Sequence, residues 1–397
     1  MLKYSIFLVC VGYLCGCTQE TDTSNTLVIN PTTNYSPFDL LEYVDRLEYI
    51  PLEEKEGVLL NDIKKIIKLD DAYVVQCYKR SALFFFDTEG QYLKRVVATG
   101  EGPKEFSNLM DVTYDEQENR LFLLDFHQKK VVVYDLDGDG TIQEGINLDH
   151  HAYSIAHFDS KLYLISSYSE LEKVKIYSDS TFELIGSGVP TRQKGFNWVA
   201  TQDNMYVYGD TLFVNVGFTD TIYYSTGNDL KPYALLGEGR TSLTSITDRS
   251  ELFGRSTHPE VEKLTTPEER NVIVPVGMFS IYNNIWFNLL VWPDKVIIWN
   301  RNKNIQRYLD FKDVENRSLI CTYWLFNFFD IDEEGFTYNP LMLNDAFYAD
   351  AKKVVASDKY DEQLKAPIKE LLEKYPEGSG YENPIIVKVR FDEAMFN

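Results

Sequence analysis

The chain of 397 residues is long enough to bury a large core, and its 44% apolar and 25% charged residues are typical of a globular protein. A formal net charge of −22, with no basic stripe to offset it, would repel a phosphate backbone, which excludes nucleic acid as a partner. The many tyrosine and phenylalanine residues favour strands over disorder.

The N-terminus has the pattern of an exported lipoprotein. Lys3 precedes a short apolar run, Tyr4 to Tyr13, which cannot span a membrane. Leu14-Cys15-Gly16-Cys17 then has the order of a lipobox, in which the thiol of Cys17 takes a diacylglycerol and becomes the new N-terminus. We expect a signal peptide and lipobox over residues 1–17, and a lipoprotein of the outer membrane that faces the periplasm or the cell surface.

Residues 18–40 are polar and lack an apolar period, which predicts a flexible tether before a domain over residues 41–397. Two cysteines, Cys77 and Cys321, remain in that domain, each within an apolar strand-like run. Buried free thiols are the favoured interpretation, and a single disulfide is the alternative.

A repeated unit dominates the domain. The run Ala82 to Gly90, apolar residues followed by Asp-Thr-Glu-Gly, matches Lys130 to Gly138 at an offset of 48 residues. Two further strand-like runs precede each copy, so each repeat predicts a four-stranded propeller blade.

Four weaker copies follow, which gives an all-β, six-bladed propeller with four-stranded blades. The last two copies are rich in tryptophan and phenylalanine and have no clear Asp-x-x-Gly turn. A polar stretch at residues 241–270 predicts an insertion after the fourth blade. The four copies are Tyr153–Ile185, Asn197–Tyr233, Met278–Leu309 and Thr322–Val355.

The C-terminal region predicts one short helix and a closing strand. Tyr360 to Tyr375 places leucine and isoleucine at helical spacing. Ile385 to Phe391 is the natural partner of the early strand Leu47 to Leu52, because pairing both termini removes open edges from the ring.

Residues 40–392 resemble the six-bladed β-propeller lipoproteins of Bacteroides and relatives, which are similar to TolB-like and NHL-type propellers. Four segments in order support the resemblance. It implies a fold and an envelope location, but no general chemistry, so no catalytic residue follows from it. The segments are Leu47-Glu48-Tyr49-Ile50-Pro51-Leu52-Glu53, Gly100-Glu101-Gly102-Pro103-Lys104-Glu105-Phe106, Asp220-Thr221-Ile222-Tyr223 and Asn383-Pro384-Ile385-Ile386.

Two loops carry carboxylates with alternative interpretations. Asp135, Asp137 and Asp139 have the spacing of the start of a calcium loop, but the closing glutamate is missing and a hairpin turn explains the same residues. Glu101 and Glu105 lie in a glycine loop that lacks the Lys-Ser/Thr of a phosphate cradle. We expect a crossover between blades there, with Phe106 plugged between them, and keep both glutamates as candidate ligand-binding residues.

Histidine and tryptophan add further candidates. His150, His151 and His157 cluster in the sequence without an acidic ligand set beside them, so connections between blades are favoured over a metal site. His258, beside two glutamates in the insertion, and Trp292, at a turn, are candidate ligand-binding residues. The other aromatic residues around Trp292 are expected in the core.

These patterns favour a non-enzymatic binding or scaffold lipoprotein of the envelope. Its partners would be the membrane, through the lipid anchor, and a glycan, peptide or envelope protein. The alternative is a calcium-dependent propeller hydrolase or lyase with its metal in the central channel. The sequence has no Gly-x-Ser-x-Gly, His-Glu-x-x-His or Cys-x-x-Cys motif, and it identifies no catalytic residue or metal ligand set.

Overall fold

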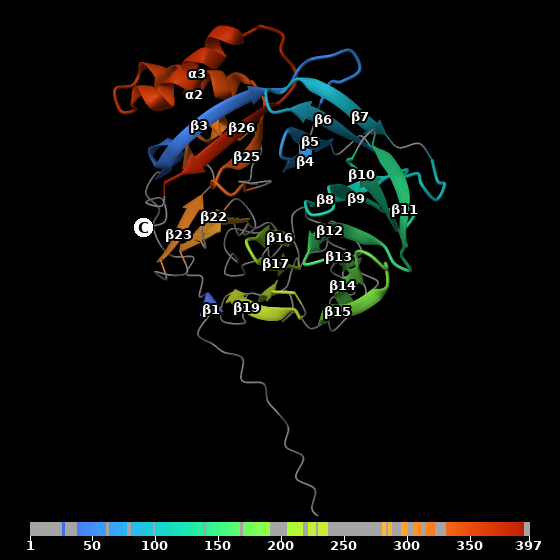
Figure 1. Cartoon of the computed structure of the whole chain (residues 1–397). Helices are drawn as coiled ribbons and strands as arrows, with labels where there is room; N and C mark the ends of the chain where they lie inside the picture. Colours follow the sequence, from blue (N-terminus) through green and yellow to red (C-terminus); the bar gives the residue numbers. More distant parts are fainter. Residues whose placement is uncertain are drawn as a thin grey trace, which may run out of the picture.

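The computed structural model describes residues 26–27, 38–60, 63–77, 81–97, 100–137, 140–166, 170–190, 205–216, 221–227, 229–236, 280–282, 285–287, 295–300, 305–310, 314–321 and 331–392. These residues form a β-propeller in which successive antiparallel sheets follow one another around a centre (Figure 1). In the second to fourth blades, the first strand lies toward the centre and the last at the periphery (Figure 1). No helix of the described part is long and apolar enough to cross a membrane.

Within the described residues, five sheets have the four strands of a propeller blade. They are β4 (Ile63–Lys68), β5 (Ala72–Cys77), β6 (Ala82–Asp87) and β7 (Tyr92–Val97); β8 (Leu109–Asp115), β9 (Arg120–Asp125), β10 (Lys130–Asp135) and β11 (Thr141–Asn147); β12 (Ala152–Phe158), β13 (Lys161–Ser166), β14 (Glu172–Ser178) and β15 (Leu184–Pro190); β16 (Met205–Tyr208), β17 (Thr211–Asn215), β18 (Thr221–Ser225) and β19 (Lys231–Leu236); and β20 (Ser280–Tyr282), β21 (Ile285–Phe287), β22 (Lys295–Asn300) and β23 (Ile305–Asp310).

The prediction of six four-stranded blades is wrong, because the described residues form five. In the described part of the chain, the last sheet has three strands, in the order β25 (Thr337–Leu341), β26 (Ile385–Phe391) and β3 (Val44–Pro51). Part of the expected sixth repeat is instead helix α2 (Asp345–Ala356). Asn344 caps this helix by accepting from the Phe347 amide, and Phe347, Ala351 and Val354 are buried at helical spacing.

Burial explains why the strands of one blade differ in sequence. The middle strands β5 and β6 are apolar and buried almost throughout, because neighbouring blades cover both of their faces. The outer strand β7 alternates between half-buried and exposed residues, because one of its faces meets solvent. Phe106 is fully buried between the first two blades, which confirms its predicted role as a plug.

The Asp-x-x-Gly turn predicted from the first repeat is present and recurs near the C-terminus. Asp87 Oδ1 accepts from the amides of Glu89 (2.9 Å) and Gln91 (2.8 Å), and Gly90 has a φ of +84°. Asp332 Oδ1 accepts from the amides two and four residues later in the same way, and Gly335 has a φ of +80°. The expectation that the sixth repeat lacks this turn is therefore wrong.

The three-stranded sheet is covered by two helices, α2 and α3 (Glu362–Lys374) (Figure 1). Helix α3 confirms the predicted C-terminal helix, and Asp361 caps it by accepting from the Leu364 amide (2.9 Å). One face of the sheet packs on the first blade, and its other face packs on the helices. The pairing of β26 with β3 confirms the predicted closure by strands from both ends of the domain.

Two short described strands precede β3. Strand β1 (Thr26–Leu27) pairs in parallel with β19 of the fourth blade, and β2 (Phe38–Asp39) pairs with β24 (Val314–Glu315). Short 3₁₀ helices follow each of the latter strands, at Leu40–Tyr43 and Arg317–Leu319.

Asp39, at the end of β2, is bonded to residues from the C-terminal part of the domain. Its carboxylate accepts from Lys359 (2.6 Å), Tyr360 and Asn316 (2.8 Å). Burial opposes its ionisation, but these donors outweigh burial and lower the pKa of Asp39. Strand β2 is therefore tied to the connection between α2 and α3 and to Asn316, which follows β24.

Candidate functional site

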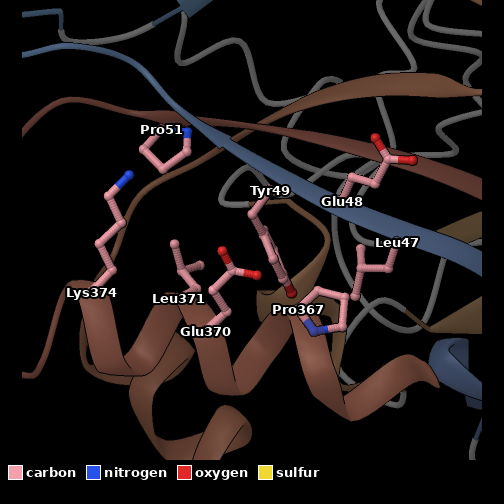
Figure 2. A pocket seen from close by; sticks show the side chains of 8 residues that line it. All are labelled: Leu47, Glu48, Tyr49, Pro51, Pro367, Glu370, Leu371 and Lys374. Carbon is pink, nitrogen blue, oxygen red and sulfur yellow. The ribbon is translucent and has the colours of Figure 1, made fainter. Parts of the chain in front are cut away.

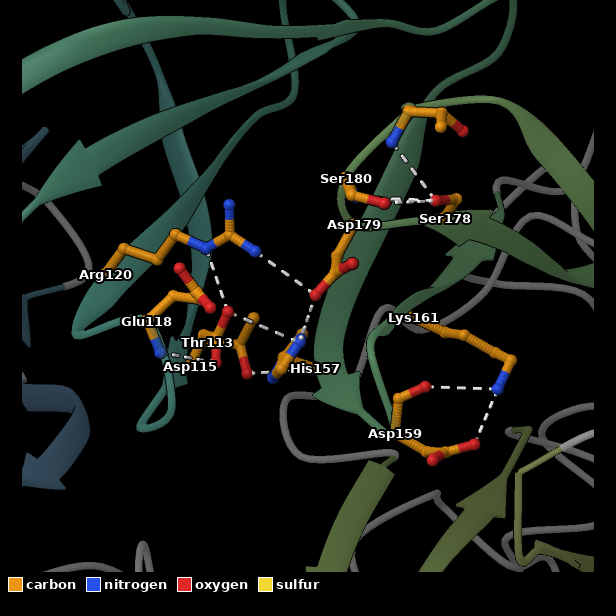
Figure 3. A network of polar contacts seen from close by, with 11 residues as sticks. Thr113, Asp115, Glu118, Arg120, His157, Asp159, Lys161, Ser178, Asp179 and Ser180 are labelled. Carbon is orange, nitrogen blue, oxygen red and sulfur yellow. Dashed lines mark hydrogen bonds and ion pairs between the residues drawn. The ribbon is translucent and has the colours of Figure 1, made fainter.

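Four charged side chains meet where the second and third blades join. Asp115 ends β8, Arg120 begins β9, His157 lies near the end of β12, and Asp179 follows β14 (Figure 3). We name these four residues the rim cluster. Asp115 and Asp179 are buried, and Arg120 and His157 are largely covered, so the cluster lies in the joint between two blades.

Arg120 and His157 each bridge the two carboxylates of the rim cluster. Arg120 donates from Nε to Asp115 (2.8 Å) and from Nη2 to Asp179 (3.2 Å). His157 Nε2 lies 2.9 Å from Asp179 and 3.6 Å from Asp115. Both side chains also pack on the ring of Phe122. The guanidinium is 4.8 Å from the ring centroid, and the imidazole stacks on the ring at 5.6 Å. The charges of two blades are thus paired with one another.

The ligand atoms of Asp115, His157 and Asp179 lie within 4.8 Å of one another, a spacing that a metal ion could bridge. The donor set does not fit calcium, however, because the Arg120 guanidinium is bonded to both carboxylates and would face the ion. Calcium also prefers oxygen ligands to imidazole. The rim cluster therefore does not match the predicted channel metal.

A second network joins the innermost strands of the first three blades. The buried carboxylate of Asp111, on β8, accepts from Lys65 Nζ (3.1 Å), Ser154 Oγ (3.0 Å) and the Ile155 amide (2.9 Å). Burial opposes its ionisation, but Lys65, Lys64 and two backbone amides outweigh burial and lower the pKa of Asp111. One carboxylate on β8 therefore fastens β4 and β12 to the second blade.

This second network also provides hydrogen-bond acceptors for the backbone amides at the open edge of β12. The first strand of a blade has neighbours in its sheet on one side only, which leaves alternate amides facing the centre. On β12 these amides belong to Ile155 and His157. The first donates to Asp111, and the second donates to Thr113 Oγ1 (3.0 Å). Side chains of one blade thus take the place of a missing strand for the next.

Comparison with known proteins identifies the family. Residues 26–390 match a family described as a domain of unknown function, DUF4934. The chain belongs to this family. No curated protein matches it.

Two solved structures align with most of this chain. A candidate exported protein from Bacteroides fragilis superimposes with a TM-score of 0.66, at 16% identity, over 90% of this chain and 98% of that chain. A member of the DUF4221 family from Bacteroides vulgatus gives a TM-score of 0.46, at 12% identity, over 88% of this chain and 97% of that chain. The first likeness shows a common propeller fold and does not extend to an activity.

In this family member, the glycine loop is a crossover between blades, as the sequence predicts. Glu105 accepts from the Gly102 amide (2.8 Å), so its carboxylate is turned onto its own loop. Gln128 and Lys130 of the second blade donate to the carbonyls of this loop, at 2.9 and 2.6 Å. Glu101 is exposed at the start of the loop, and the structure brings neither glutamate to the rim cluster.

The aspartates that have the spacing of a calcium loop lie in the hairpin turn between β10 and β11. Asp135 accepts from the amide of Asp137 (2.9 Å) and from Gln143 (3.3 Å). Asp137 accepts from Asn119 Nδ2 (2.7 Å). Both carboxylates thus have partners within or beside the turn, as the hairpin interpretation predicts, and Asp139 lies outside the described residues.

The structure separates the three histidines that lie close in the sequence. His150 pairs with Asp149 (2.7 Å), and His151 bonds the carbonyl of Phe126 (2.8 Å). Of the three, His157 contacts two carboxylates, Asp115 and Asp179, and these come from distant turns, which the sequence did not indicate. Cys77 and Cys321 are buried free thiols, as expected. Cys17, His258, Trp292 and the insertion at residues 241–270 lie outside the described residues.

Sequence reasoning missed Asp111, Asp115, Arg120 and Asp179 as interacting residues. A weak signal existed, because Asp115 and Asp179 stand at strand ends like Asp87 and Asp135 of the repeated turn. That position marks a turn, but it does not reveal which turns meet.

Proposed function

We propose that this chain is an exported lipoprotein whose propeller binds a glycan, peptide or partner protein of the envelope and does not convert a substrate. One observation carries the proposal. The acid and base side chains gathered at the joints between the first three blades pair with one another and fasten the blades, as Asp111 and the rim cluster illustrate. Such groups stabilise a scaffold and are not presented to a substrate.

The location proposed is the outer membrane, with the lipid on Cys17 as anchor and the polar residues between Cys17 and β1, the first part of the predicted tether 18–40, as the link to the propeller. The lipobox order and the charged, apolar start of the sequence support it. The candidate exported protein of Bacteroides fragilis, with its similar fold, is consistent with export.

Metabolic labelling with an alkyne palmitate in a Bacteroides host tests the anchor. We expect the full chain to be labelled and membrane-bound, and Cys17→Ala to lose the label. Cys15→Ala is the matched control, because Cys15 would leave with the signal peptide. Label that persists in Cys17→Ala, or is lost equally in Cys15→Ala, would contradict anchoring at Cys17.

Metal analysis of the mature chain from Thr18 onward, with melting temperatures before and after chelation, tests the non-catalytic part. We expect no bound calcium and no change in melting temperature. A tightly held calcium whose removal lowers the melting temperature would overturn this part and favour the hydrolase or lyase. Screening the same protein on glycan and peptide arrays then identifies the class of ligand.

A further inference from the structure

The three-stranded sheet of the described residues has β3 at one edge. Its order is β25, β26 and β3, so β3 forms the sheet edge where a fourth strand would pair. An edge strand with unpaired amides and carbonyls is a template for a further strand.

The pairing with β26 shows which backbone groups of β3 face outward. Leu52 N donates to the carbonyl of Pro384 on the β26 side, and partners alternate along an antiparallel pair. Leu47 and Tyr49 therefore direct their N–H and C=O groups away from β26. In the described part of the chain, no hydrogen bond from outside the sheet reaches the backbone of either residue.

The same edge is already bonded at both ends. Gln363 of α3 donates to the carbonyl of Asp45 (3.3 Å), and the Glu53 amide donates to the carbonyl of Gly90 in the first blade (2.8 Å). The open stretch is thus a short window centred on Leu47 and Tyr49. An extended segment of a few residues would fill it.

A groove runs beside this window, between β3 and α3. Figure 2 shows side chains of the strand and of the helix facing each other across it. The hollow is about 220 Å³, and a second hollow of about 290 Å³ continues it along β3 past Asp45. Leu47, Tyr49, Pro367 and Leu371 give it apolar walls. A strand edge beside an apolar groove is the geometry of peptide recognition by strand addition.

The negative charge along the groove favours a basic ligand. Its acidic lining residues outnumber the basic ones, Arg46 and Lys374. Part of this negative charge is balanced, because Arg46 pairs with Glu48 (3.1 Å) and Arg390 pairs with Asp45 (2.6 Å), but no described base pairs with Glu370. A basic extended segment is therefore favoured. The acidic residues are Asp45, Glu48, Asp361, Glu370 and Asp392.

We propose that the groove between β3 and α3 binds an extended peptide segment of a partner protein, which adds a fourth strand to the edge of β3 and places basic side chains beside Glu48 and Glu370. The inference rests on the proposed binding function and deepens it by naming a peptide as the ligand. Backbone bonds to Leu47 and Tyr49 would supply affinity, and the apolar walls and carboxylates would supply specificity.

The test uses synthetic peptides and the mature chain at physiological salt, read by fluorescence anisotropy. The probe is a fluorescein-labelled Lys-Val-Lys-Val-Lys-Val-Lys-Val peptide. A Glu-Val repeat and a Lys-Val repeat N-methylated at alternate residues are the control peptides. We expect the Lys-Val peptide to bind, and each control peptide to bind at least roughly tenfold more weakly, because one loses the charge match and the other loses strand pairing.

Two surface variants separate the groove from the overall negative charge. Glu370→Lys alters the groove, and Glu373→Lys makes the same charge change on an exposed residue of α3 outside it. We expect only Glu370→Lys to weaken binding, by roughly tenfold. Equal weakening by both variants, or equal binding of the N-methylated peptide, would reduce the interaction to surface charge and overturn the proposal.

Other occupants give distinct results. A chain that forms dimers in light scattering, with the Leu47 and Tyr49 amides protected from hydrogen exchange only in the dimer, would show that a second copy fills the edge, and would overturn the proposal. If no peptide binds but a glycan does, the groove proposal fails while the proposed binding function survives. Bound calcium that stabilises the chain would count against the binding function itself.

Discussion

The first three blades and the three-stranded sheet differ in how the backbone groups of their edge strands are bonded. Among the first three blades, the amides of Ile155 and His157 on β12 donate to side chains of the preceding blade. In the sheet, the outward backbone groups of Leu47 and Tyr49 border a groove. The comparison teaches that polar side chains close one edge to build a rigid ring, whereas the other edge has a shape suited to a ligand.

Asp111→Asn should cause the largest loss of stability, and this loss should come from the joints among the first three blades alone. The variant leaves Lys65 without its buried counter-ion, and breaking a buried pair costs about 3–5 kcal/mol. Urea unfolding at pH 7 measures the loss. Glu116→Gln, at an exposed position near the same end of β8, is the control and should change little.

The Asp111→Asn effect should also depend on pH. The folded-state pKa of Asp111 lies below its ordinary value of 3.8, so its stabilisation is present at neutral pH and is lost as the pH falls through the folded-state pKa. The gap between wild type and variant should therefore narrow below pH 3.8. A gap that stays constant in acid would show that the carboxylate charge does not matter.

Arg120→Met should come next, with a loss of about 3 kcal/mol, because it leaves Asp115 and Asp179 close together without the cation that bridges them. Arg95→Met, at an exposed arginine of the first blade, is the control. If unfolding free energies of the two variants agree, the rim cluster does not hold the second and third blades together.

Pro367→Ala should act in the opposite direction and on the other region. Pro367 lies inside α3, where proline cannot donate the amide that the helix needs, and alanine is favoured by up to about 3 kcal/mol. We expect a higher melting temperature by calorimetry. A lower melting temperature would show that packing of the proline ring in the groove outweighs the lost helix bond.

Lys173→Met should give a gain of at most about 3 kcal/mol at pH 7, reduced by the hydrogen bond to the Glu170 carbonyl that methionine cannot form. Burial lowers the pKa of Lys173 from 10.5 to about 8, an effect that Glu170 opposes only in part. The unfolded chain therefore holds the proton more tightly, and wild-type stability should rise between about pH 8 and 10.5.

Methionine at position 173 should abolish that alkaline rise, which denaturation at a series of pH values would reveal. Lys175→Met, at a less buried position of the same strand, serves as the control. An unchanged alkaline rise in Lys173→Met would assign it to another group.

The features that the sequence predicted correctly depend on local pattern. The turn at Asp87, the plug at Phe106 and helix α3 follow from spacing within a few residues. The pairing of β3 with β26 was predicted because a ring must close, although these strands are far apart in the sequence.

The features that the sequence missed have two causes. Helix α2 carried a signal in Asn344 and in the spacing of Phe347, Ala351 and Val354, but the repeat pattern favoured a sixth blade. The rim cluster joins turns from two blades, and no spacing reveals which turns converge. The groove lies between β3 and α3, which come from opposite ends of the domain, so no local pattern could show it.

Residue-level hydrogen exchange of the mature chain tests the comparison most directly, because it reads both edges in one experiment. The account predicts strong protection of the Ile155 and His157 amides and exchange at least roughly 100-fold faster for the Leu47 and Tyr49 amides. Equal protection at both edges in the free monomer would contradict the claim that the β3 edge is open to a partner strand.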